Sequence, residues 1–145
     1  MNNVTKMKIG KPARDVFEAF VDPAQIGHFW FSSSSARWEQ GKTITLRYEE
    51  YGAEGDISVV DIVDNEKIVF EWNYGEDIHT VTITLTEHEA GTTIVEIVED
   101  GFKQGGEDWI EMLVGNKEGW VYMLTCLKGY MEHGITTLRA ALIHG

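Results

Sequence analysis

The stretch FEAFVDPAQIGHFW, residues 17–30, places large apolar side chains on either side of an Asp-Pro turn. They are Phe17, Phe20, Ile26, Phe29 and Trp30. Asp22 ends a helix over 13–21, because the residue before a proline is pushed out of the α region. Pro23 suits the first turn of a second short helix, with Asp22 as its N-cap. Whether these side chains fill a core or line a cavity decides whether the protein holds a ligand.

Length and charge limit the number of domains and the classes of partner that we expect. The chain has 145 residues, the usual size of one domain, so we expect a single domain over residues 1–145. Its net charge of -12 repels polyanions, which argues against nucleic acid and anionic membrane surfaces. No apolar run is long enough for stable membrane insertion, and the first residues lack the features of a secretion signal. We therefore expect a cytoplasmic protein.

The first two thirds of the chain predict a sheet. A loosely alternating stretch over 4–9 predicts a first strand, and period-two alternation runs from 38 to 100, as in an antiparallel meander. The alternating sets are Ile44/Leu46/Tyr48, Ile68/Phe70/Trp72, His79/Val81/Ile83/Leu85 and Val95/Ile97/Glu99. Residues 57–63 are apolar on both faces, which indicates a bulge or two-sided burial. The serine run at 32–35 has no apolar anchor and predicts a mobile loop.

After the glycine-rich segment 101–106 the pattern becomes helical and stays so to the end. One apolar stripe predicts a helix of about 25 residues across the concave face of the sheet. The stripe consists of Trp120, Leu124, Leu127, Met131, Ile135, Leu138 and Leu142. The fold class is therefore α+β, with a curved antiparallel sheet of about six to seven strands around a long C-terminal helix and two short helices after the first strand.

Four stretches together resemble a known family. They are ARDVFEAFVDPAQIGHFW (13–30), WEQGKTITLRYE (38–49), NEKIVFEW (65–72) and EGWVYMLTCLKGYMEHG (118–134). The chain resembles the activator of heat-shock-protein-90 ATPase-like branch of the START-like (SRPBCC) superfamily. The resemblance implies a helix-grip fold around an apolar cavity. Many relatives carry Gly-Gly where this chain has Gly41-Lys42, which affects only a turn.

We expect the inward sheet residues and the helix stripe to enclose a cavity, although a plain packed core would use the same residues. The predicted occupant is a small hydrophobic molecule, lipid-like or aromatic. The predicted ligand-binding residues are Phe29, Trp30, Leu46, Tyr48, Phe70, Trp72, His79, Val81, Ile97, Glu99, Trp120, Met123, Leu124 and Leu127.

His79 and Glu99 form a candidate polar pair within this set. A hairpin turn at 87–91 would place Val81 opposite Glu99, and His79 near Glu99 on the concave face. A buried carboxylate is costly without a partner, so Glu99 must meet water, His79 or a ligand. Three roles stay open: a solvated pair at the cavity mouth, orientation of a ligand, and acid-base catalysis.

The sequence gives little indication of a cysteine nucleophile or a metal site. Cys126, the one cysteine, reads as a buried structural thiol, and the histidines show no metal-ligand spacing, so we expect neither metal nor cofactor. The favoured function is a carrier or sensor of a small hydrophobic molecule, more in keeping with binding than with catalysis. The alternatives are a cyclase or dehydratase that uses His79 and Glu99, and a chaperone-cofactor-like interaction domain. Chaperone contact and homodimer formation stay open.

Overall fold

The computed structural model describes residues 2–143 and combines one antiparallel sheet with one long helix. The elements are β1 (Asn2–Ile9), α1 (Ala13–Val21), η1 (Ile26–His28), β2 (Ser33–Ser34), β3 (Thr43–Tyr48), η2 (Glu49–Tyr51), β4 (Ala53–Val63), β5 (Lys67–Tyr74), β6 (Asp77–Glu89), β7 (Thr92–Asp100) and α2 (Trp109–His133). Here η marks a single turn of 3-10 helix.

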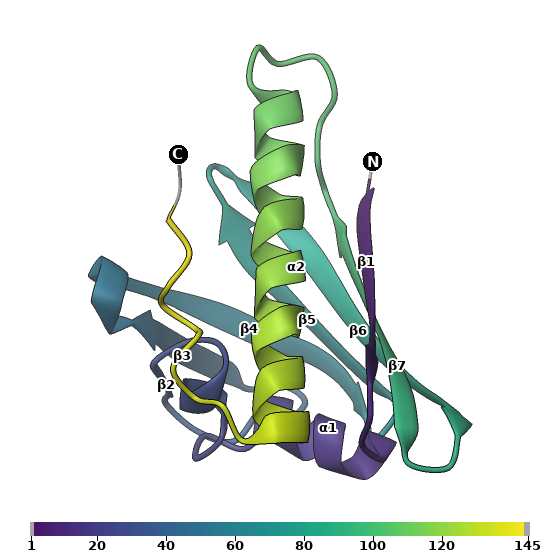
Figure 1. Cartoon of the computed structure of the whole chain (residues 1–145). Helices are drawn as coiled ribbons and strands as arrows, with labels where there is room; N and C mark the ends of the chain where they lie inside the picture. The colour runs from purple at the N-terminus through teal and green to yellow at the C-terminus, as the bar shows by residue number, and fades with distance from the viewer. Residues whose placement is uncertain (1, 144–145) are drawn as a thin grey trace.

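The seven strands form an open sheet in the order β1-β7-β6-β5-β4-β3-β2, and every neighbouring pair is antiparallel. Figure 1 shows α2 crossing one face of this sheet, with α1 below its C-terminal end. An apolar sheet face requires such a cover. The predicted helix-grip fold is confirmed.

A bulge in β4 explains why its sequence is apolar on both faces. The pairing with β5 shifts register between Val59 and Asp61. Val59 is buried, whereas the next residue, Val60, remains 45 % exposed. The strand therefore contributes apolar side chains to the core on one side of the shift without burying both faces, and the bulge predicted from the sequence is confirmed.

The opening stretch divides between two environments. Phe17, Phe20 and Ile26 are buried in the core. Asp22 has extended backbone after α1, and its carboxylate accepts hydrogen bonds from the Ala24 N–H at 2.9 Å and from a side-chain amide. The backbone hydrogen bond is the main cause that lowers the pKa of Asp22. The predicted second helix is a single 3-10 turn, Ile26–His28, and the predicted N-cap was wrong: the turn starts after Gln25, and no side chain caps it. The turn leads directly into the Phe29-Trp30 pair.

The sequence predicted a loop for the serine run at 32–35, and this prediction was wrong. Ser33–Ser34 forms the edge strand β2 beside β3. The Ser32 N–H donates to the Arg47 carbonyl at 2.7 Å, and the Ser35 N–H donates to the Thr45 carbonyl at 2.9 Å. Main-chain pairing with a neighbouring strand, which needs no apolar side chain, orders this segment.

The long helix has the predicted length, but its predicted position was wrong. It starts at Trp109 and ends at His133, so Ile135, Leu138 and Leu142 lie beyond it. Gly134 adopts a left-handed φ of 66°, its N–H donates to the Tyr130 carbonyl, and the Ile135 N–H donates to the Gly129 carbonyl. This pattern ends helices. The following residues, 134–143, form a segment that we call the C-terminal strap.

We predict that Gly134→Ala destabilises the protein by about 1 kcal/mol, because alanine resists a left-handed φ. Gly119→Ala is the matched control, since Gly119 lies inside α2 without positive φ and a Cβ there would meet nothing within 4 Å. The control should gain up to about 1 kcal/mol from helix propensity. Urea unfolding measures both; equal effects of the two substitutions would contradict the assignment of the helix end.

Candidate ligand-binding pocket

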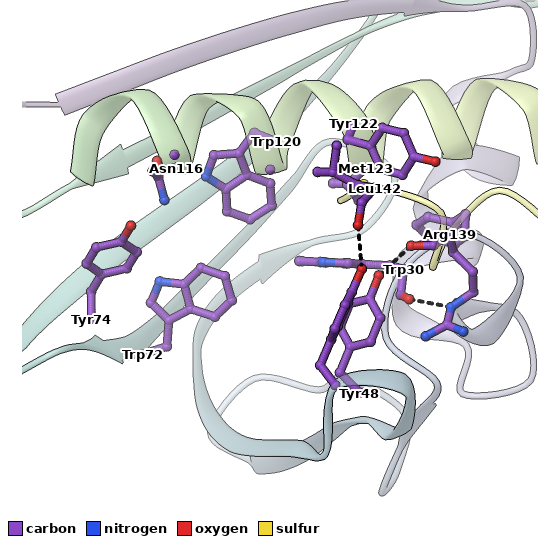
Figure 2. A pocket seen from close by; sticks show the side chains of 14 residues that line it. Trp30, Tyr48, Trp72, Tyr74, Asn116, Trp120, Tyr122, Met123, Arg139 and Leu142 are labelled. Atoms are coloured by element: carbon purple, nitrogen blue, oxygen red, sulfur yellow. Dashed lines mark hydrogen bonds between the residues drawn. The ribbon is translucent and has the colours of Figure 1, made fainter. Parts of the chain in front are cut away.

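A pocket of about 320 Å³ lies between α2, the β3–β5 side of the sheet and the C-terminal strap. This volume is at the lower end of the range for small-molecule sites. Its lining residues come from several segments far apart in the sequence and are predominantly aromatic (Figure 2). They are Phe29, Trp30, Tyr48, Tyr51, Trp72, Tyr74, Gly115, Asn116, Gly119, Trp120, Tyr122, Met123, Arg139 and Leu142.

Two glycines one helical turn apart leave space on the helix side of the pocket. A Cβ built on Gly115 or Gly119 would meet no atom within 4 Å. Glycine inside a helix costs about 1 kcal/mol relative to alanine. The pair therefore weakens α2 at the place where side chains would otherwise narrow the pocket.

Stacked indoles from β5, α2 and the opening stretch form one wall of the pocket. The Trp72 and Trp120 rings lie 5.6 Å apart with an interplanar angle of 24°, and Trp30 lies 5.4 Å from Trp120 at 60°. Offset and tilted arrangements of this kind are favourable for aromatic pairs. A planar apolar molecule would find complementary ring faces here.

Behind this wall, the Glu99 carboxylate is fully buried and accepts four hydrogen bonds. His79 Nδ1 and Trp72 Nε1 contact Oε2 at 2.7 and 3.2 Å. Asn116 Nδ2 and Trp120 Nε1 donate to Oε1 at 2.9 and 3.0 Å. An ionised carboxylate only accepts hydrogen bonds, so we assign the proton of this contact to His79 Nδ1. The four donors then satisfy the roughly four acceptor sites of the carboxylate.

The strand register explains the His79–Glu99 contact. Val81 pairs with Glu99, as the sequence predicted, and the predicted proximity of His79 and Glu99 is confirmed. The alternative of a solvated pair at the cavity mouth is wrong, because the His79 and Glu99 side chains are 1 % and 0 % exposed. His79 also stacks on Tyr74 with ring centroids 4.8 Å apart. Neither member of the pair lines the pocket; Trp72, Tyr74, Asn116 and Trp120, which they contact, do.

The C-terminal strap closes the other side through tyrosine hydroxyls that donate to strap carbonyls. The pairs are Tyr48 with Arg139 at 2.5 Å, Tyr51 with Leu142 at 3.1 Å and Tyr122 with Leu138 at 2.6 Å. Burial raises the pKa of Tyr48 to about 12, so this hydroxyl keeps its proton at neutral pH. The dashed lines in Figure 2 show strap contacts at the pocket edge.

Arg139 anchors the strap and is only 8 % exposed. Its Nε donates to the Trp30 carbonyl at 2.6 Å, and its Nη atoms donate to Glu50 and to Ser32. The guanidinium also lies 4.8 Å from the Tyr48 ring centroid. The hydrogen bonds from Arg139 are the main cause that lowers the pKa of Glu50 to about 2. A paired cation therefore joins the strap to η2 and to the end of the opening stretch.

A family model described as activator of Hsp90 ATPase homolog 1-like protein matches residues 11–132. The chain belongs to this family. A crystal structure of a Staphylococcus saprophyticus protein is 52 % identical, with a TM-score of 0.83 and coverage of 96 % of this chain and 97 % of that chain. Among curated proteins, none matches the chain.

More distant proteins of known structure share the fold. The solution structure of an Aha1 dimer from Colwellia psychrerythraea is 16 % identical, with a TM-score of 0.78 and coverage of 92 % of this chain and 98 % of that chain. An HSP90 activator from Plasmodium falciparum is 18 % identical, with a TM-score of 0.70 and coverage of 92 % and 96 %. At these identities the likeness concerns the fold alone.

The pocket of this family member draws in part on the residues named from sequence. Phe29, Trp30, Tyr48, Trp72, Trp120 and Met123 line it. The other named residues are buried outside the lining, either in the apolar core or in the polar pair. They are Leu46, Phe70, His79, Val81, Ile97, Glu99, Leu124 and Leu127.

Sequence reasoning missed eight lining residues, which are Tyr51, Tyr74, Gly115, Asn116, Gly119, Tyr122, Arg139 and Leu142. One signal was available: Gly115 and Gly119 share a helix face, and glycines at that spacing indicate space beside a helix. Arg139 and Leu142 could not be found, because the strap had been assigned to the helix. Cys126 is buried, as expected.

Metal and membrane sites find no support within residues 2–143. No group of three or more His, Cys, Asp or Glu side chains there could hold a metal ion. No helix in the same range combines the length and apolar character needed to cross a bilayer.

We predict that Glu99→Gln destabilises the protein by about 3–5 kcal/mol, because an amide turns an NH₂ group toward donors that need an acceptor in a buried site. Glu96→Gln on the same strand is the control; Glu96 forms an exposed ion pair with Lys6 and should cost less than about 1 kcal/mol. Chemical denaturation measures both. Similar losses for the two variants would show that the buried carboxylate does not stabilise the fold.

The Arg139–Glu50 contact should persist at mildly acidic pH. The pKa of Glu50 is lowered from 4.5 to about 2, so its stabilising contribution is present above pH 4.5 and is lost as pH falls through about 2. Carbon-13 NMR titration of the Glu50 carboxyl group would report this midpoint. Arg139→Gln should move the midpoint upward, and a wild-type midpoint near 4.5 would refute the contact.

Proposed function

We propose that this protein binds a small, mainly apolar molecule with a planar or aromatic part in the pocket between α2, the sheet and the strap, as a carrier or sensor. The observation that carries the proposal is the aromatic lining beside the glycine pair of α2. Trp30, Trp72 and Trp120 provide ring faces, and Gly115 and Gly119 leave room in the same pocket. Apolar pockets with few polar groups are typical small-molecule sites.

The geometry favours a structural role for His79 and Glu99 over acid-base catalysis. A general base must reach the proton that it removes. Glu99 already accepts hydrogen bonds from His79, Trp72, Asn116 and Trp120, and neither member of the pair lines the pocket. The pair supports the proposal indirectly, because it holds two indoles of the pocket wall in place. Distant relatives named as an HSP90 activator or a dimer share the fold only, so neither property belongs to this proposal.

Gly119→Leu should block the pocket while leaving the fold intact. The leucine side chain would enter the open space beside Trp120, and leucine favours a helix over glycine by roughly 1 kcal/mol. The fluorescent probe N-phenyl-1-naphthylamine should bind the wild type and bind Gly119→Leu at least tenfold more weakly. Thr125→Leu, on an exposed part of the same helix, is the matched control and should bind like the wild type.

Native mass spectrometry of freshly purified protein complements the probe. A co-purifying small molecule that is lost from Gly119→Leu and kept in Thr125→Leu would support the proposal. Failure of the wild type to retain any molecule, together with equal probe binding by wild type and Gly119→Leu, would exclude the pocket as the binding site.

A further inference from the structure

The indole N–H groups of the tryptophans in the core and the pocket wall differ in one respect. Trp38 Nε1 donates to Ser34 Oγ at 3.3 Å, and Trp72 and Trp120 donate to Glu99. Trp30 Nε1 has no hydrogen-bond acceptor among the residues that the structure describes, although the side chain is 93 % buried, being 7 % exposed. Buried indole N–H groups usually find a partner, so this exception needs an explanation.

The surroundings hold the Trp30 ring in position. Phe20 packs edge-on against it at 6.2 Å, and Trp120 and Trp38 lie 5.4 and 6.1 Å away. The Trp30 carbonyl accepts the hydrogen bond from Arg139 Nε, which fixes the backbone. The ring therefore cannot turn to another acceptor without disturbing the core, because close-packed interiors resist such shifts.

The free N–H faces accessible space. Within residues 2–143, Thr5 Oγ1 is the fully enclosed side-chain polar atom without a partner, so Trp30 Nε1 is not enclosed in the same way. Trp30 lines the pocket, and its ring lies between Trp72 and Trp120 on one side and Tyr48 and Arg139 on the other (Figure 2). Among the pockets described for residues 2–143, the one that Trp30 lines is this pocket.

From this geometry we propose that Trp30 Nε1–H donates a hydrogen bond to an oxygen acceptor of the bound molecule, which is a neutral aromatic carbonyl compound or one of similar polarity. This inference rests on the proposed function and specifies the ligand class. The Trp72 and Trp120 N–H groups are already used by Glu99, and Tyr48 donates its single hydroxyl proton to Arg139. Among the three tryptophans that line the pocket, Trp30 is the one whose N–H group has no acceptor within residues 2–143.

The charges around the pocket favour a neutral acceptor over a carboxylate. Glu99 lies directly behind Trp72 and Trp120, and the Arg139 guanidinium is already paired with Glu50. The chain as a whole carries a net charge of -12. An anionic ligand would meet like charge without a free cation to offset it, whereas a carbonyl oxygen needs only the N–H donor.

The test uses two probes of similar shape, 2-acetylnaphthalene and 2-isopropylnaphthalene, which differ in a carbonyl acceptor. Trp30→Phe should weaken binding of the acetyl probe about threefold to tenfold more than binding of the isopropyl probe, as expected for one net hydrogen bond. Trp38→Phe is the matched control, because Trp38 is also buried but does not line the pocket. It should change both affinities by the same factor. Quenching of tryptophan fluorescence measures binding.

NMR of the nitrogen-15-labelled wild type provides a readout that does not depend on the variant. The Trp30 indole proton should shift downfield with the acetyl probe and not with the isopropyl probe. If both probes bind but Trp30→Phe weakens them equally and the indole shifts are alike, the hydrogen bond is refuted while the pocket stands. If neither probe binds the wild type, the proposed function itself fails together with this inference.

Discussion

The buried carboxylate of Glu99 is the interaction on which the pocket wall depends. A buried charge is tolerated only when hydrogen bonds replace its hydration. Here the four donors come from β5, β6 and α2, so satisfying one group on β7 fixes the helix relative to three adjacent strands. Two of the donors are the indoles of Trp72 and Trp120, and their orientation follows from the same constraint. The polar centre thus shapes an apolar surface without contributing to its lining.

Space in the pocket results from what the helix lacks as much as from what the sheet provides. A regular amphipathic helix would place side chains of leucine size along its whole inner face and pack against the sheet at interior density. α2 does so around Leu124 and Leu127, which are fully buried. About one and a half to two and a half turns before Leu124, Gly119 and Gly115 present no side chain. The same helix therefore closes a core at one end and leaves a cavity at the other, which answers the question raised by the opening stretch: its phenylalanines before Asp22 fill the core, and Phe29 and Trp30 reach the pocket.

The sequence predicted the strands and the contacts that follow from the pairing of neighbouring strands. Alternation over 38–100 fixed the strands and their order along the sheet, and one hairpin turn sufficed to bring His79 to Glu99. It could not predict the strap, because Ile135, Leu138 and Leu142 continue a helical spacing and Gly134 alone marks the end of α2. The lining residues of the strap and of η2 depend on contacts between segments about 90 residues apart, such as Tyr48 with Arg139 and Tyr51 with Leu142. Periodicity carries no information about such contacts.

The two sides of the pocket differ in how they are held. The Glu99 side consists of buried and partly buried side chains on regular elements, which bond to a fully buried carboxylate. The strap side is held mainly by tyrosine side chains that donate hydrogen bonds to strap carbonyls. Within residues 134–143, the backbone hydrogen bond runs from the Ala141 N–H to the Leu138 carbonyl. Local opening requires least free energy where backbone bonds and buried apolar contacts are few. The strap side is therefore the part of the pocket wall that opens at the lower cost in free energy, and the indole wall is the rigid part.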